Sequence, residues 1–105
     1  MGTGLSTYLG PNAYYLSIGN TATMAAVGAN PSRIGLTIQN NSANTLTFTF
    51  GSTTPVSATT GIQVAANSNY TVPVTGMGLV GNIGAQLNMI CNVAGPSNIT
   101  VLEFF

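Results

Sequence analysis

Charged side chains are almost absent from this 105-residue sequence, in which only Arg33 and Glu103 are ionised at neutral pH. A typical soluble domain is roughly 25% charged, so the surface of this chain must consist of hydroxyl, amide and apolar groups. A net charge of zero also removes the repulsion that keeps copies of a protein apart, and so favours association. The composition therefore predicts a protein that works in an assembly.

The scarcity of basic residues excludes two classes of partner. Binding to nucleic acid requires several Lys or Arg side chains near the phosphates, and binding to anionic membranes requires basic clusters. One arginine meets neither requirement, so we expect no nucleic-acid partner and no membrane partner. The sequence also has no apolar run of about 18 residues, and its start lacks the basic region of a secretory signal.

The residues of acid-base and metal chemistry are missing as well. The chain contains no His, Lys or Asp, which excludes a Ser-His-Asp triad, a carboxylate pair and a His or Cys metal cluster within one copy. We therefore expect no enzyme activity, no cofactor, no metal and no small-molecule substrate. Cys91 has no other cysteine with which to form a disulfide. It follows Leu87 and Met89 at intervals of two residues, which places the three side chains on one face of a strand and predicts that Cys91 is buried.

Period-two alternation of apolar and polar residues is the main structural signal. Hydrophobic residues make up 45% of the chain, too many for a disordered protein with this composition. In residues 45–50, Leu46, Phe48 and Phe50 alternate with threonines, and residues 33–39 repeat the pattern with Ile34, Leu36 and Ile38 on one face. Residues 40–44 have the composition of a turn, so the two runs together predict a β-hairpin.

Further strands are predicted between the Gly, Pro, Asn and Ser residues that punctuate the chain, at 14–18, 21–27, 61–64, 70–74, 78–83, 87–93 and 99–104. Regular short strands indicate an all-β fold, an antiparallel β-sandwich or jelly roll with an extended N-terminal segment. We assign residues 20–105 to a single domain. Residues 98–105 are apolar on both faces, which predicts a strand that is central or buried at an interface.

Residues 1–19 combine glycines with tyrosines, which is typical either of an anchoring arm or of a loosely packed first strand. Arg33 and Glu103 are candidates for an ion pair. An exposed pair would contribute about 0–1 kcal/mol, whereas removing one partner of a desolvated pair would cost about 3–5 kcal/mol; the sequence leaves both cases open. The candidate interface residues are Tyr8, Tyr14, Tyr15, Arg33, Glu103, Phe104 and Phe105.

Residues 32–42, with the sequence SRIGLTIQNNS, and residues 45–51 after them resemble a hairpin of small virion proteins of tailed bacteriophages. Residues 61–73 and the ending Val101-Leu102-Glu103 are similar to the same proteins, so the resemblance spans roughly residues 31–105. It implies a β-sandwich or jelly-roll subunit, often a trimer, that decorates a phage capsid and cements neighbouring major capsid proteins. Such a protein is made in the host cytoplasm and located on the capsid surface.

An alternative function is a glycan- or receptor-binding module of a phage tail or fibre. Tyr rings can stack on sugars, and Asn side chains can form hydrogen bonds to them. The absence of Trp and the scarcity of acidic residues weaken this alternative.

Overall fold

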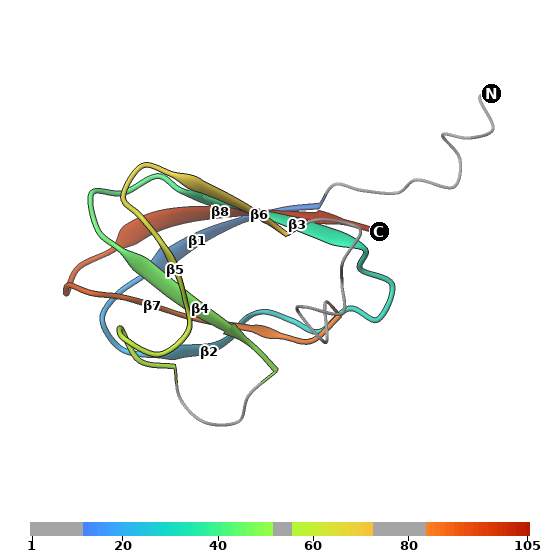
Figure 1. Ribbon diagram of the computed structural model, residues 1–105, viewed down its shortest axis with the longest axis horizontal. Helices are drawn as coiled ribbons and strands as arrows, with labels where there is room; N and C mark the ends of the chain where they lie inside the picture. The colour runs from blue at the N-terminus through green and yellow to red at the C-terminus, as the bar shows by residue number, and fades with distance from the viewer. Residues whose placement is uncertain (1–11, 52–55, 73–83) are drawn as a thin grey trace.

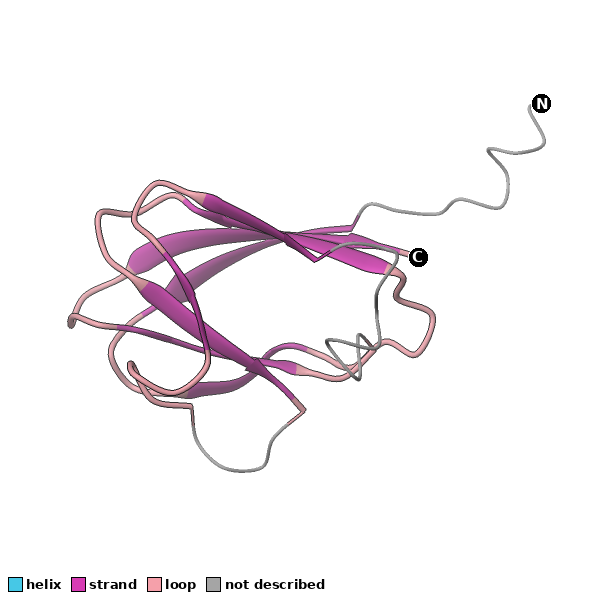
Figure 2. Cartoon of the chain, in the orientation of Figure 1, coloured by secondary structure: helices cyan, strands magenta, loops and turns pink. Residues whose placement is uncertain are grey.

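The computed structural model describes residues 12–51, 56–72 and 84–105, and these contain strands and loops but no helix (Figure 2). The described part thus has no helix that is long and apolar enough to cross a membrane. Its eight strands are β1 (Asn12–Ile18), β2 (Thr23–Val27), β3 (Gly35–Asn40), β4 (Leu46–Phe50), β5 (Ile62–Val64), β6 (Asn69–Val72), β7 (Leu87–Cys91) and β8 (Ser97–Phe104).

The strands form two four-stranded antiparallel sheets that pack as two layers (Figure 1). Sheet A has the order β1-β8-β3-β6 and sheet B the order β2-β7-β4-β5. Each of the first four strands pairs with one of the last four in reverse order: β1 with β8, β2 with β7, β3 with β6 and β4 with β5. The four pairs are divided between the two sheets, two pairs in each. This topology is that of a jelly roll and confirms the predicted all-β sandwich.

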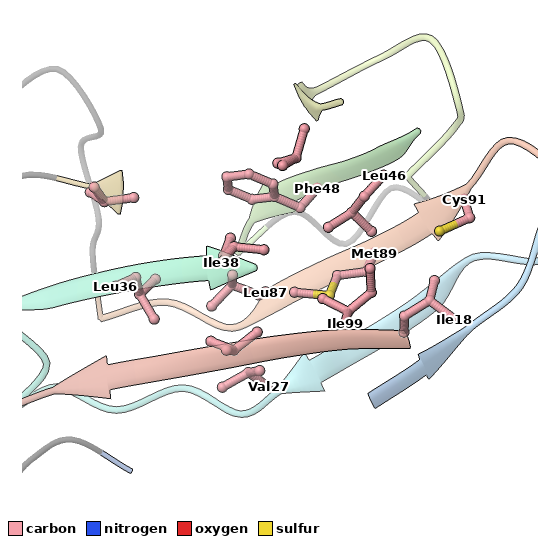
Figure 3. Packing of buried hydrophobic residues seen from close by; sticks show 13 residues of the cluster. Ile18, Val27, Leu36, Ile38, Leu46, Phe48, Leu87, Met89, Cys91 and Ile99 are labelled. Atoms are coloured by element: carbon pink, nitrogen blue, oxygen red, sulfur yellow. The ribbon is translucent and has the colours of Figure 1, made fainter. Parts of the chain in front are cut away.

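The core lies between the two sheets, where inward-facing side chains of both meet in a single cluster. Figure 3 shows Ile38 from sheet A and Leu46, Phe48 and Met89 from sheet B in this cluster. The Phe48 ring also makes edge-to-face contacts with Phe50 and Tyr70, with ring centroids 5.7 and 5.6 Å apart. Cys91 is 0% exposed in the same cluster, which confirms its predicted burial.

The predicted hairpin of residues 33–39 and 45–50 is wrong. β3 pairs with β6 and β8 in sheet A, whereas β4 pairs with β5 and β7 in sheet B. Residues 41–45 therefore cross from one layer to the other. The alternation in both runs is correct for β-strands, but it carries no information about which strands pair.

Two side chains in these runs also depart from the expected pattern. Ile34 precedes β3 and is 45% exposed, so it does not share the inward face of Leu36 and Ile38. Thr47 is on the outward face of β4 but is buried, because Ala58 and Gly61 lie against it. Its hydroxyl donates to the Ala58 carbonyl at 3.0 Å, and a Cβ on Gly61 would lie 2.9 Å from its methyl group.

The first and the last described strands are neighbours in sheet A. β8 lies between β1 and β3, so the central position predicted as one alternative for residues 98–105 is correct. Residues 12–18 form β1, paired with β8 at every position, and Ile18 reaches the core. Residues 12–18 thus form a fully paired strand, neither extended away from the fold nor loosely packed, and the docking role of the N-terminal segment stays a prediction. Residues 1–11 and the strand predicted at 78–83 lie outside the described residues.

Candidate protein interface

Arg33 and Glu103, the only two ionised side chains in the sequence, are buried together at one end of the sandwich. Arg33 is 2% and Glu103 is 1% exposed. The Nε and Nη2 atoms of Arg33 lie 2.9 and 2.8 Å from Oε2 of Glu103. Of the two cases that the sequence left open, the desolvated pair is therefore the one that forms.

The guanidinium of Arg33 also connects the two sheets. Glu103 belongs to β8 of sheet A, whereas the other two acceptors flank strands of sheet B. Nη1 donates to the Ala85 carbonyl, before β7, at 2.6 Å, and Nη2 donates to the Gly28 carbonyl, after β2, at 2.7 Å. The planar, forked shape of a guanidinium allows one side chain to reach all three acceptors.

The second oxygen of Glu103 binds to the first strand. Oε1 accepts a hydrogen bond from the Tyr14 hydroxyl at 2.9 Å and another from Nδ2 of Asn12 at 3.5 Å. Burial alone would raise the pKa of Glu103, but hydrogen bonds from Tyr14, Arg33 and Asn30, together with the positive charge of Arg33, hold it below its ordinary value. The hydrogen bond to Glu103, burial and the carboxylate charge raise the pKa of Tyr14.

The interface role predicted for Arg33 and Glu103 is corrected by this arrangement. Their side chains offer almost no surface to a partner, and their charges are neutralised inside the fold. Because the sequence has no other side chain ionised at neutral pH, the surface of the protein carries no charged side chain.

The outer face of sheet A is an uncharged surface formed by residues that alternate with the core positions. Residues paired across neighbouring antiparallel strands share a face. Two rows therefore cross the whole sheet on its outer side. These rows are Tyr15–Thr100–Gln39–Asn69 and Ala13–Leu102–Thr37–Thr71.

Among the tyrosines predicted at an interface, Tyr15 is 81% exposed on this outer face. Tyr14 is half-buried on the opposite face of the same strand, where it contacts Glu103. Tyr8 lies outside the described residues. The outer face thus brings together only part of the predicted set.

Phe104 and Phe105, at the C-terminal end, are both half-buried. Phe104 pairs with Gly35, and this position alternates with the inward-facing Glu103. Sequence reasoning missed Leu102, which lies on the same outer face. The signal was available in residues 98–105, because a strand with apolar residues on both faces must place one set of them away from the core.

Among the described residues, the other large apolar side chains that are exposed, Met24, Ile34 and Val93, belong to different parts of the chain. Single exposed apolar residues are normal on protein surfaces and mark no site by themselves. The outer face of sheet A is instead a continuous surface of hydroxyl, amide and apolar groups. Such a surface is suited to packing against another protein without the desolvation of charges.

Comparison with models of known protein families found no match, and comparison with curated protein sequences found none either.

Proposed function

We propose that this chain is a structural protein of a phage virion that decorates the capsid and cements neighbouring major capsid proteins through protein–protein packing. The observation that carries the proposal is the burial of both charged side chains. A protein without surface charge has little to oppose its association. Residence in a permanent assembly explains why such a surface is tolerated.

The fold and the resemblance give separate support. Jelly rolls recur in viral capsid proteins, but also in lectins, so the fold alone assigns neither function. The residues that resemble phage virion proteins include β3, β4 and the end of β8. β3 and β8 contribute Gln39, Thr100 and Leu102 to the outer face of sheet A, which is the surface that we propose contacts the capsid.

The first test is the composition of purified particles. We expect this chain to be present in a fixed ratio to a large shell-forming protein. We also expect it to stay bound when salt is raised to about 1 M, where the Debye length is near 3 Å, because no surface charge contributes to docking. Particles without the chain, or its release by salt, would contradict the proposal.

A matched pair of variants tests the docking surface. Gln39→Lys places a charge on the outer face of sheet A, and Gln63→Lys makes the same change on β5 of sheet B. Burying an unpaired charge is costly, so we expect Gln39→Lys to weaken capsid binding at least about tenfold, equivalent to about 1.4 kcal/mol. Gln63→Lys should bind like the unmodified chain. Equal binding by both variants would place the contact elsewhere.

A second candidate function, glycan binding by a tail or fibre module, is favoured by one observation. The exposed ring of Tyr15 shares its row with Thr100, Gln39 and Asn69, whose hydroxyl and amide groups can form hydrogen bonds to a neutral sugar. Binding to neutral glycans that is lost in Tyr15→Ala, in a chain absent from capsids, would favour this function over decoration.

A further inference from the structure

The four edge strands of the sandwich differ in how well they are protected from pairing with another strand. β5 has three residues and β6 four. β2 has five, but its register with β7 shifts between Thr23 and Val27, and Ala25 within it has a φ of 51°. Short edges and irregular edges are common protections against strand addition. Three of the four edges therefore carry such a protection.

β1 has none of these protections. It has seven residues, pairs with β8 at all seven positions, and contains no charged residue and no proline. None of the described residues pairs with its outer side. A long, regular and uncharged edge is the kind of strand that accepts a further strand.

The hydrogen bonds of sheet A identify the main-chain groups that β1 presents at this edge. Asn41 donates to the Asn98 carbonyl, so Asn98 faces β3, and its neighbour Ile99 faces β1. Ile99 pairs with Leu16. Because successive residues of a strand face opposite sides, the N–H and C=O groups of Ala13, Tyr15 and Ser17 point to the open edge.

We propose that β1 pairs in antiparallel orientation with β1 of a second copy of this chain, about a two-fold axis at Tyr15. In this register Tyr15 meets itself and Ala13 meets Ser17 of the second copy. The free N–H and C=O groups of these residues then find partners in both copies. Sheet A of one copy continues into sheet A of the other.

The sequence of β1 favours a second copy as the occupant of this edge, because the strand is complementary to itself. The two-fold axis places Tyr14 opposite Leu16 of the second copy, and both side chains are half-buried against the edge of the core. It places the exposed rings of the two Tyr15 residues side by side on the outer face. Cross-strand aromatic and apolar pairs stabilise sheets, and no charge in β1 opposes the contact.

The test uses charges of both signs at the proposed axis. We expect the full chain to form a dimer in sedimentation experiments at concentrations up to about 1 mM. Tyr15→Lys and Tyr15→Glu should each raise the dimer dissociation constant at least about tenfold, because like charges then lie directly opposite each other. An equimolar mixture of the two variants should regain association, since Lys and Glu then meet.

Thr71→Lys is the matched control, because Thr71 is exposed on the outer face of the opposite edge strand, β6. It should dimerise like the unmodified chain. A second measurement tests the register: Tyr15→Cys should form a disulfide-linked dimer on oxidation, because residues in a hydrogen-bonded antiparallel pair have Cα atoms about 5.5 Å apart. Thr71→Cys should not form one under the same conditions.

A monomeric chain at all concentrations, a trimer, or a mixture of the charged variants that associates no better than either alone would overturn this inference. The inference rests on the proposed function only in taking the chain to work by protein packing. The two fail separately. A dimer of this kind that never joins a particle would remove the proposed function, and a chain that joins particles as a monomer would remove the dimer.

Discussion

Buried polar groups connect the two sheets at both ends of the sandwich, but by different chemistry. At the ion-pair end, Arg33, Glu103 and Tyr14 join sheet A to the segments that flank β2 and β7. At the amide end, Asn40, 1% exposed at the end of β3, joins sheet A to β5. Among the described residues, no buried side-chain N or O atom lacks a hydrogen-bond partner.

Asn40 satisfies its end with neutral groups. Its Nδ2 lies 2.7, 3.1 and 3.1 Å from the carbonyl oxygens of Asn44, Val64 and Ala65. Its Oδ1 accepts hydrogen bonds from the amide and the hydroxyl of Ser42. Nδ2 of Asn44 extends this network to the Ser97 hydroxyl at 2.9 Å.

The difference between the ends lies in what each network depends on. The amide end buries neutral dipoles, so losing one of its hydrogen bonds costs the free energy of leaving one buried polar group unsatisfied. Because none of these groups titrates, this cost does not depend on pH. The ion-pair end buries two charges, each of which is tolerated only while the other is present. The ion-pair end should therefore be the more sensitive to substitution and the only one of the two that responds to acid.

The largest effect is expected from Arg33→Met. This change leaves Glu103 buried without its cation and leaves the carbonyls of Ala85 and Gly28 without a donor. We expect the free energy of unfolding to fall by about 3–5 kcal/mol, measured by urea denaturation followed by circular dichroism.

The double variant Arg33→Met/Glu103→Leu is the control for this prediction, because it removes both charges together. Replacing a buried ion pair by apolar residues is often neutral, so we expect the double variant to be more stable than Arg33→Met alone. A single variant that loses less than about 1 kcal/mol would show that the pair behaves as an exposed one.

A smaller effect is expected at the amide end. Asn40→Ala removes hydrogen bonds to three carbonyls, and we expect a loss of about 2–3 kcal/mol that is the same at all pH values between about 3 and 9. Asn40→Asp instead aims a carboxylate at the same oxygens, which raises its folded-state pKa above the unfolded value. Its stability should be highest in acid and should fall as pH rises above about 4. Urea denaturation of Asn40→Ala and the unmodified chain over this pH range measures the loss. A loss in Asn40→Ala that changes with pH would contradict the interpretation of this end as a neutral network.

The sequence predicted the strands well because alternation is a local property. The runs at β3, β4 and β7 show which side chains face inward, and burial of Leu36, Phe48 and Met89 follows from it. Pairing is not local. Residues 40–44 have turn chemistry, and this favoured a hairpin, but the same Asn and Ser side chains form the amide end of a crossing between sheets.

The candidate interface was less predictable for the same reason. Arg33 and Glu103 are 70 residues apart, and only the position of β8 beside β3 shows that they meet inside the fold. Glu103 lies two residues after Val101, on the same inward face of β8. This position in the period-two pattern by itself indicates a buried side chain. Tyr14 and Tyr15 were grouped by composition, although adjacent strand residues face opposite sides.

The smallest effect concerns the acid dependence of the ion-pair end. The folded-state pKa of Glu103 is lowered, so the stability that it contributes is complete above the unfolded pKa of about 4.3 and is lost as pH falls below it. Glu103 is the only carboxylic acid side chain of the sequence. Apart from the terminal carboxylate, the free energy of unfolding should therefore change by no more than about 1.4 kcal/mol per pH unit, which corresponds to the binding of one proton.

Tyr14→Phe tests this assignment, because it removes the hydrogen bond to Glu103 that helps to lower the pKa of the carboxyl. Tyr14 is half-buried, and we expect a loss of about 1 kcal/mol at pH 7. The difference from the unmodified chain should shrink in acid, where Glu103 is neutral in both proteins. The pKa of Tyr14 is raised in the folded state, so its ionisation above about pH 10 favours the unfolded state. The unmodified chain should therefore lose stability in this range, and Tyr14→Phe should lack that loss. Tyr15→Phe, a change of the exposed neighbour, is the matched control and should follow the unmodified chain throughout. A Tyr14→Phe variant whose deficit is constant from pH 7 to about pH 2 would show that Tyr14 stabilises the fold by packing and not through the carboxylate.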